Sequence, residues 1–338
     1  MKVICTEKNK VKHWFEAIHK TQLFESSSLR GLGSSPTVKE PVVALQAVIL
    51  DSPTPIQALR TWLFKQCRAG QDTLVLDLGE QQWSKSDLAE LLSWVESSAQ
   101  TVHVLKLGEA ALDLEAFAYL VEWQQQTAVN VNEWDLGNMV VTLPRARILA
   151  QLCDNMGGKG KINFSQSYWD STQMKVWLWS CKQGINCNRI TLGAMRCPAE
   201  SIDMLMMHCM LPSSKLEVFS TGTTLLSERA LGSLLAGIRD KAVTIQACVL
   251  CRQHFSKNNS ALLLDVLLNS GSLQRVALME CLLDTYDWPE ASAAKAKVKK
   301  VYLETDIEYS KDDTLKKLIS LGYKEERKLT EHKVWLTQ

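Results

Sequence analysis

Pairs of apolar residues, separated by one variable position, recur along this chain at a nearly constant distance. Counted along the chain from the second member of each pair, the successive steps are 28, 29, 29, 28, 28, 26, 27, 33 and 25. Such a pair is typical of a strand that buries alternate side chains. The pattern therefore predicts ten copies of one structural unit, whose pairs are Val48/Leu50, Leu76/Leu78, Leu105/Leu107, Trp134/Leu136, Ile162/Phe164, Ile190/Leu192, Leu216/Val218, Val243/Ile245, Val276/Leu278 and Val301/Leu303.

Each pair is followed by one more apolar position and then by a stretch with helical spacing. Leu88, Leu91, Leu92 and Val95 are one example of residues at i, i+3, i+4 and i+7, which form one face of a helix. Each unit is therefore predicted to be a strand followed by a helix. The additional apolar positions are Trp83, Leu112, Val141, Trp169, Cys197, Leu250 and Leu283.

A period of about 28 residues around an L-x-L kernel indicates leucine-rich repeats. Over residues 42–305 the chain resembles the ribonuclease-inhibitor-like class of these proteins, which is also found in the sensor arrays of NOD-like receptors. The resemblance implies an α/β solenoid of about ten repeats, with a parallel sheet on its concave face and helices on its convex face. Because parallel strands lie about 4.8 Å apart and packed helices about 8–10 Å apart, the array is expected to bend into a horseshoe.

The chain departs from this family at one position of the repeat. The family places Asn or Cys five residues after the first member of the pair, where the side chain caps the turn that leaves the strand. This chain has Gln81, Ala110, Met139, Ser167, Met195, Thr221, Cys248 and Cys281 there. Several turns are therefore expected to satisfy their backbone groups by other means.

The repeat pattern also divides the chain. Residues 1–41 are predicted to form a helical cap and a linker, residues 42–305 the array, and residues 306–338 a cap at the other end. The last cap is expected to contain a helix at Leu315, Leu318 and Ile319 and a strand at Val334, Trp335 and Leu336.

Composition indicates a soluble chain that functions inside the cell. No run of eighteen apolar residues predicts a membrane span, and no apolar leader follows Met1. We therefore expect a cytoplasmic protein whose cysteines are reduced and mostly serve as small core residues. The 38 basic and 37 acidic side chains give a net charge of +1, which does not favour nucleic-acid binding.

Two sequence patterns resemble a metal site and a phosphate-binding loop, and we interpret both as structural. Cys248, Cys251 and His254 have metal-like spacing, but a zinc site needs a fourth ligand. The run 157–161 (GGKGK) lacks the spacing of a phosphate-binding loop and is predicted to be a turn. In addition, no histidine lies at a recognisable distance from a nucleophile. We therefore predict no catalytic residue, no cofactor and no metal.

The remaining candidate site is the concave face of the predicted array. Glycines at 79, 108, 137 and 193 would leave one column bare, so that a partner could approach the backbone. Phe219, Met279 and Tyr302 are predicted to form an apolar anchor for the partner. The full set of candidate partner-binding residues is Asp77, Lys106, Asp135, Asn163, Arg189, Glu217, Phe219, Gln246, Met279 and Tyr302.

These features favour a non-enzymatic recognition or adaptor protein that binds a protein partner of unknown identity. One alternative is the substrate-recognition subunit of a ubiquitin ligase, or a bacterial effector. The other is a GTPase-activating protein of the Ran type, which usually has an acidic tail that is not seen in this sequence. The sequence does not determine the oligomeric state.

Overall fold

Strands and helices alternate along the described part of the chain. The computed structural model describes residues 73–78, 82–98, 101–108, 111–181, 184–240, 244–285, 288, 296–304, 313–330 and 333–338. The chain divides into two units, Met1–Gly70 and Gln71–Gln338, and every described residue belongs to the second. The predicted N-terminal cap, the pair Val48/Leu50 and the positions Gly79, Gln81, Ala110 and Val243 lie outside the described residues.

One mostly parallel sheet runs through the second unit. Its strand order is β1-β3-β5-β6-β7-β8-β9-β11-β13-β15-β14, and every pairing from β1 to β13 is parallel. The order therefore follows the chain, as stacked strand-helix units require. The parallel strands are β1 (Thr73–Asp77), β3 (Thr101–Lys106), β5 (Asn130–Asp135), β6 (Lys161–Asn163), β7 (Arg189–Thr191), β8 (Val218–Ser220), β9 (Ala247–Cys251), β11 (Arg275–Met279) and β13 (Lys300–Glu304).

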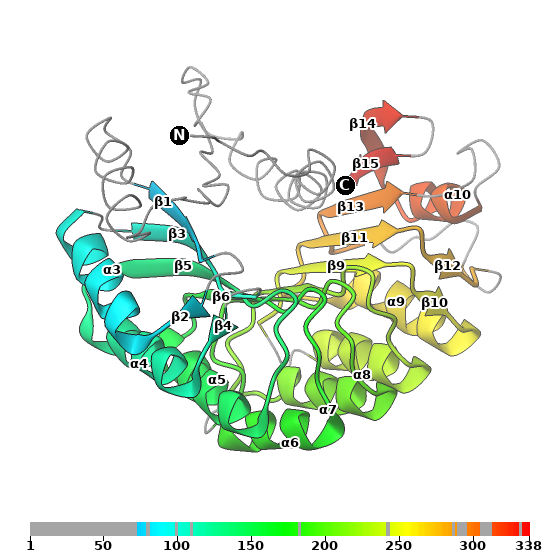
Figure 1. Ribbon diagram of the computed structural model, residues 1–338. Helices are drawn as coiled ribbons and strands as arrows, with labels where there is room; N and C mark the ends of the chain where they lie inside the picture. Colours follow the sequence, from blue (N-terminus) through cyan, green and yellow to red (C-terminus); the bar gives the residue numbers. More distant parts are fainter. Residues whose placement is uncertain are drawn as a thin grey trace. The chain divides into compact units, whose positions relative to one another are not determined.

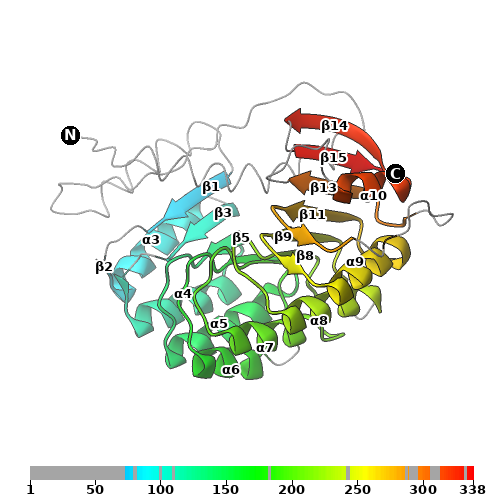
Figure 2. The ribbon, with the colours of Figure 1, turned by 90° about the vertical axis from the view of Figure 1, so that its right-hand side faces the viewer.

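The helices lie together on one side of this sheet (Figures 1 and 2). Each packs against the helix of the next unit, from α3 to α9. The prediction of a mixed α/β repeat with a parallel sheet and a separate helix layer is confirmed. The helices are α3 (Lys85–Ser98), α4 (Leu114–Gln126), α5 (Leu143–Met156), α6 (Ser171–Ser180), α7 (Ala199–Cys209), α8 (Glu228–Arg239) and α9 (Lys257–Asn269). Among the described residues, none of the helices combines the length and the apolar character needed to cross a membrane.

Helix starts follow the local sequence. Asp170 accepts a hydrogen bond from the backbone of Gln173, whose side chain accepts one from the Asp170 N–H, so α6 begins with a capping box. Ser227 caps α8 through the Ala230 N–H. Ser256 caps α9, which begins at Lys257, through the Asn259 N–H.

The register of the sheet corrects two of the predicted pairs. The first core position of each unit is occupied by Leu76, Leu105, Trp134, Ile162, Ile190, Phe219, Cys248, Val276 and Val301, which are aligned from strand to strand. Leu216/Val218 and Val243/Ile245 are therefore not the core pairs of their units. Phe219/Thr221 and Cys248/Leu250 take these positions.

The corrected register also makes the period regular. The steps between successive first positions become 29, 29, 28, 28, 29, 29, 28 and 25. The irregular steps of 26, 27 and 33 arose because the pairs Leu216/Val218 and Val243/Ile245 stood in place of Phe219/Thr221 and Cys248/Leu250. In the first of these two units the second core position is filled by Thr221, a polar residue that is fully buried. Its hydroxyl Oγ1 accepts a hydrogen bond from the Cys251 N–H at 3.0 Å and donates to the Gly222 carbonyl at 3.1 Å. A buried hydroxyl is tolerated when its hydrogen bonds are made.

The core lies between the sheet and the helices. Trp83, Trp134 and Trp169 are buried there, as predicted. Phe164, Trp169 and Trp177 pack with ring centroids 5.2–5.4 Å apart, which is a favourable distance for aromatic contacts.

The C-terminal segment adds two antiparallel strands to the sheet. The strand β15 (Lys333–Thr337) pairs with both β13 and β14 (Lys324–Thr330), and the helix α10 (Asp313–Ser320) precedes them. The predicted last helix and last strand are therefore confirmed. Since β15 runs against β13, it ends the parallel repeat.

A second, shorter set of pairings follows the turns that leave the main strands. It pairs β2 (Gln82–Trp83) with β4 (Ala111–Leu112), and β10 (His254–Phe255) with β12 (Leu282–Leu283). Between them, Tyr168 forms parallel bridges with Val140 and Arg196. Here Phe255, and not Leu250, takes the additional apolar position of its unit.

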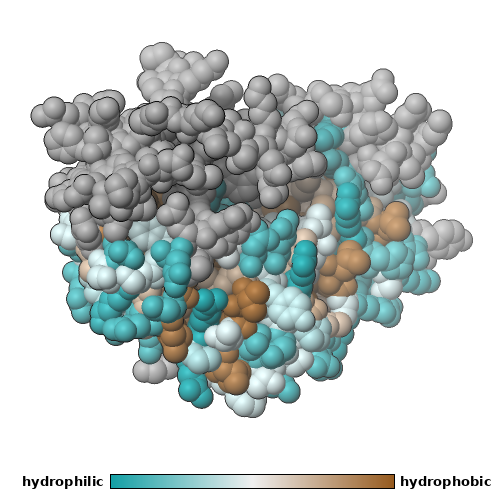
Figure 3. Space-filling model, viewed as in Figure 1, coloured by the Kyte–Doolittle hydropathy of each residue, from teal (hydrophilic) through white to brown (hydrophobic). Residues whose placement is uncertain are grey.

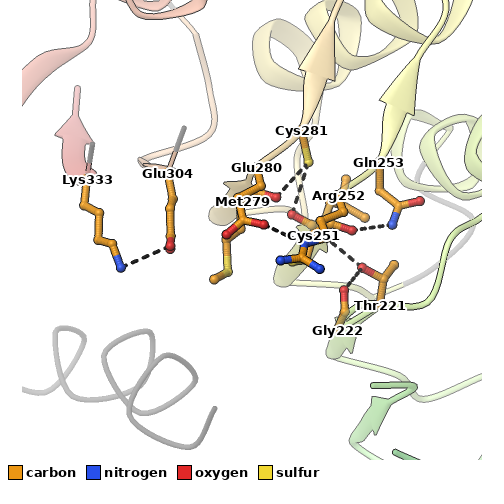
Figure 4. A network of polar contacts seen from close by, with 11 residues as sticks. Thr221, Gly222, Cys251, Arg252, Gln253, Met279, Glu280, Cys281, Glu304 and Lys333 are labelled. Atoms are coloured by element: carbon orange, nitrogen blue, oxygen red, sulfur yellow. Dashed lines mark hydrogen bonds and ion pairs between the residues drawn. The ribbon is translucent and has the colours of Figure 1, made fainter. Parts of the chain in front are cut away.

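Buried polar side chains hold these turns together, as the departure from the family pattern requires. In the corrected register Thr224 and Gln253 occupy the turn-capping position, with Ser167 and Cys281 as predicted. The amide of Gln253 donates to the carbonyls of Thr224 at 2.9 Å and Cys251 at 2.5 Å. Its Oε1 accepts from the Leu226 N–H at 2.9 Å. Figure 4 shows part of this network, with the Cys281 thiol donating to the Met279 carbonyl.

Replacing Gln253 with leucine is expected to lower the free energy of unfolding by about 2 kcal/mol. Gln253 is 1% exposed, so the buried Thr224 carbonyl and the partly buried Leu226 N–H would each lose a hydrogen-bond partner. Chemical denaturation measures the change. Gln246→Leu is the control, because Gln246 is exposed, and it should change the value by less than about 0.5 kcal/mol. Equal effects of the two substitutions would contradict a capping role for Gln253.

Candidate interaction surface

The candidate surface is the face of the sheet that points away from the helices, hereafter the helix-distal face. Side chains alternate along a strand, so residues on either side of each first core position belong to this face. One column of it contains Glu133, Lys161, Arg189, Val218, Ala247, Arg275 and Lys300. The next column contains Lys106, Asp135, Asn163, Thr191, Ser220, Val249, Ala277 and Tyr302.

Five of the predicted partner-binding residues share the second column or its continuation. Lys106, Asp135, Asn163 and Tyr302 lie in it, and the Asp77 backbone is aligned with Lys106. For Asp77 the structure describes the backbone and not the side chain. Arg189 lies in the first column, and Met279 follows the second column at the end of β11.

Asp135 and Asn163 make structural contacts on this face. The Asp135 carboxylate accepts from the Gly137 N–H at 3.0 Å and from the Asn163 amide at 3.1 Å. The Asn163 carbonyl Oδ1 accepts from the Ser165 N–H at 3.0 Å. Both side chains therefore close Asx-type turns at the ends of their strands. These contacts within the chain account for polar residues at positions 135 and 163, so a binding partner is not needed to explain them.

Three predicted residues belong to the two units whose register was wrong. Phe219 was expected to face a partner, but it occupies the first core position and is fully buried, so this prediction is incorrect. Glu217 and Gln246 each lie one residue before a strand. The Glu217 carboxylate accepts from the Asn188 amide at 2.7 Å. Gln246 is exposed, and its backbone carbonyl accepts from the N–H of Gln274 at 2.8 Å.

The other two residues of the predicted apolar anchor are on the helix-distal face but are not exposed. Met279 and Tyr302 are each 7% exposed. The Tyr302 ring packs against Trp335, with centroids 4.9 Å apart, and its hydroxyl donates to Glu304 at 3.1 Å. Glu304 also pairs with Lys333 at 3.1 Å (Figure 4). Burial and the Glu304 carboxylate raise the pKa of Tyr302, so it remains a neutral donor. The anchor of Phe219, Met279 and Tyr302 therefore does not form an exposed patch.

Two glycines of the predicted bare column, Gly108 and Gly193, are explained by packing between neighbouring units and not by access for a partner. A Cβ on Gly108 would lie 1.2 Å from the Gly137 carbonyl oxygen, and a Cβ on Gly193 would lie 2.0 Å from the Ser165 hydroxyl. Neighbouring turns therefore already occupy the space that a side chain would need. These glycines allow one unit to pack closely against the next, and they do not open the backbone to a partner.

The zinc-like triplet does not converge on one point. Cys248 is in a core position, whereas Cys251, three residues later on the same strand, belongs to the opposite face. Among the described residues, no group of three or more His, Cys, Asp or Glu side chains is placed to hold a metal ion. The run 157–161 is a turn, as predicted: Gly157 ends α5 in the left-handed conformation and Lys161 begins β6.

Three buried thiols, Cys187, Cys209 and Cys248, are expected to resist alkylation at pH 8 in the native protein. Burial raises the pKa of each thiol, so almost no reactive thiolate is present. Iodoacetamide labelling followed by peptide mass spectrometry measures each site. Cys251 is partly exposed and serves as the internal comparison. Native labelling of Cys248 as fast as Cys251 would contradict the core position, and all sites should react in denaturant.

Sequence reasoning missed two residues of the first column, Val218 and Ala247, because their units were given the wrong register. Val218, Ala247, Arg275 and Lys300 lie side by side on adjacent strands. Lys300 is ion-paired with Glu326 at 3.1 Å. A constant step of about 28 residues, if imposed on the sequence, would have placed Val218 and Ala247 correctly. The repeat period therefore indicated the correct register of these two units, but the apolar residues Leu216 and Ile245 suggested the wrong core pairs.

Together, the fold and the surface define an α/β repeat protein whose helix-distal face carries two columns of polar and apolar residues, with Asp135, Arg189, Ser220 and Tyr302 among the buried members. Comparison with known proteins adds no identification, because the chain matches no protein-family model and no curated protein shows significant sequence similarity to it.

Proposed function

We propose that this chain is a leucine-rich-repeat recognition protein without catalytic activity, which binds a protein partner through the helix-distal face. The observation that carries the proposal is the regular step of about 28 residues between aligned strands. In a leucine-rich-repeat horseshoe this face is the concave one. Closely spaced strands and wider helices support such a curvature.

The charges on the first column support a partner with acidic groups. Glu133 is followed by Lys161 and by Arg189, which is 8% exposed, and after Val218 and the buried Ala247 the column continues with Arg275 and Lys300. The column is therefore mainly basic, with an apolar interval between two basic segments. A protein surface with acidic groups on either side of an apolar contact would be complementary to it.

Reversing the charge of the column is expected to reduce partner binding at least about tenfold. The variant is Lys161→Glu with Arg275→Glu, which changes both basic segments. Affinity capture from cells, quantified by mass spectrometry, measures the proteins retained by each variant. The control is Lys175→Glu, since Lys175 is exposed on α6 in the helix layer.

Thermal denaturation should confirm that both proteins remain folded. Equal capture by the double variant and the unmodified protein would contradict the proposal that this face binds the partner. The ubiquitin-ligase and effector alternatives receive no specific support from the described residues.

A further inference from the structure

A row of exposed residues runs along the turns that leave the strands, and no prediction from sequence included it. These residues follow the first core position by six in successive units. The row, hereafter the turn row, consists of Val140, Tyr168, Arg196, Leu225, His254 and Leu282. Parallel bridges join Val140 to Tyr168 and Tyr168 to Arg196, and His254 pairs with Leu282.

The apolar members of the turn row are unusually exposed. Val140 is 57%, Tyr168 54%, Leu225 66% and Leu282 67% exposed. Most of the residues directly before and after the row are buried or half-buried, for example Ser167 and Trp169 beside Tyr168. In Figure 3, hydrophobic residues are visible on the side of the molecule that carries these turns. Apolar side chains that are this exposed and are aligned along successive units indicate an interaction site.

Two polar side chains, Arg196 and His254, interrupt this row. Arg196 is exposed, and within the described part of the chain its guanidinium makes no hydrogen bond or ion pair. Acidic side chains at the nearby helix starts accept hydrogen bonds but remain negatively charged. Asp170 caps α6, and Glu228 accepts from the Ser256 hydroxyl at 2.7 Å. Among the six residues of the turn row the charged side chain is that of Arg196, so an acidic group of a ligand placed opposite it would complete an ion pair.

We propose that the turn row binds an amphipathic helix of a partner protein whose apolar face also carries acidic residues. Neighbouring units in a parallel ladder are about 4.8 Å apart, so Tyr168, Leu225 and Leu282, two units apart from one another, are spaced by about 10 Å. Helical residues seven positions apart are separated by about 10.5 Å on the same face. An extended strand repeats on one face about every 6.8 Å and does not match this spacing.

The same geometry gives the position of the acids. Arg196 lies between Tyr168 and Leu225, and His254 lies between Leu225 and Leu282. A helix with leucine at i, i+7 and i+14 would therefore place residues i+3 or i+4 near Arg196 and i+10 or i+11 near His254. Glutamate at these positions completes the complementary pattern. The site is distinct from the helix-distal face, so it does not depend on the proposed function.

A synthetic helical peptide tests this inference directly. The peptide has about 17 residues, leucine at i, i+7 and i+14, and glutamate at i+3, i+4, i+10 and i+11. Fluorescence anisotropy with the full chain is expected to give a dissociation constant between about 1 and 100 µM. Leu225→Ser should weaken binding at least about tenfold. Arg196→Glu should weaken it similarly, and a peptide with lysine at i+3 and i+4 should bind this variant better than the original peptide does.

Trp179→Ser is the matched control. Trp179 is 76% exposed on α6, so its replacement removes an exposed apolar side chain outside the turn row without a change in packing. It should leave peptide affinity unchanged. No binding up to about 1 mM peptide would overturn the inference, as would equal losses for Trp179→Ser and Leu225→Ser. Self-association that Leu225→Ser abolishes, without peptide binding, would also overturn it and would instead assign the row to a second copy of the chain.

Discussion

Phe219→Ala is expected to lower the free energy of unfolding by about 3–5 kcal/mol, the largest effect proposed for a single substitution in this protein. Phe219 is fully buried in the first core position of its unit, aligned with Ile190 on one side and Cys248 on the other. Alanine would leave a cavity between the sheet and the helices. Urea denaturation followed by circular dichroism measures the loss.

Val218→Ala is the control for this experiment, since it changes the neighbouring residue on the opposite face. Val218 is partly exposed on the helix-distal face, so its truncation should lower the free energy of unfolding by no more than about 1 kcal/mol. The pair of variants also tests the register, because a core at Leu216/Val218 predicts the reverse order. A larger effect of Val218→Ala than of Phe219→Ala would show that Phe219 does not hold the first core position.

Gly222→Ala is expected to lower the free energy of unfolding by about 3 kcal/mol. Gly222 has φ +51°, and a Cβ there would lie 2.4 Å from the Gly193 Cα and 2.8 Å from the Gly193 nitrogen. The contacted atoms are backbone and cannot rotate away. The turn of one unit would therefore have to separate from the turn of the preceding one. The same denaturation experiment measures the change.

Gly157→Ala separates the clash from the conformational strain. Gly157 has nearly the same backbone angle, φ +59°, but no atom lies within 4 Å of the place that a Cβ would take. Left-handed strain alone should therefore cost about 1 kcal/mol at this position. If Gly157→Ala and Gly222→Ala destabilise the protein equally, close packing between the turns is not the reason for glycine at 222.

The alternation of strand and helix could be predicted because it depends on residues close together in the chain. Leu88, Leu91, Leu92 and Val95 form a buried helical face, and all four are 3% exposed or less. Helix caps such as Ser227 act within three residues and were equally visible. The order of the parallel strands then followed from the repeat, since each unit can bury its apolar face only against its neighbours.

The candidate site was harder to predict, because a shift of register changes the face on which each side chain lies. Phe219 moved from the predicted surface into the core when its unit was shifted by three residues. Met279 and Tyr302 lie on the predicted face, but Trp335 and Glu304 contact Tyr302, and Trp335 belongs to the C-terminal hairpin. No repeat pattern contains information about that contact.

The period, the strand-helix unit and most core positions follow from the amino-acid sequence, because regular burial leaves a regular apolar pattern. Which apolar residue enters the strand near residues 216–221 and 243–250 depends instead on the folded chain. Leu216, Phe219 and Ile245 are all fully buried, so hydrophobicity does not distinguish between them. The hydrogen bonds between adjacent strands do, because they fix Phe219 opposite Ile190 and Cys248 opposite Phe219. The same pairing brings residues from separate units together in the exposed turn row.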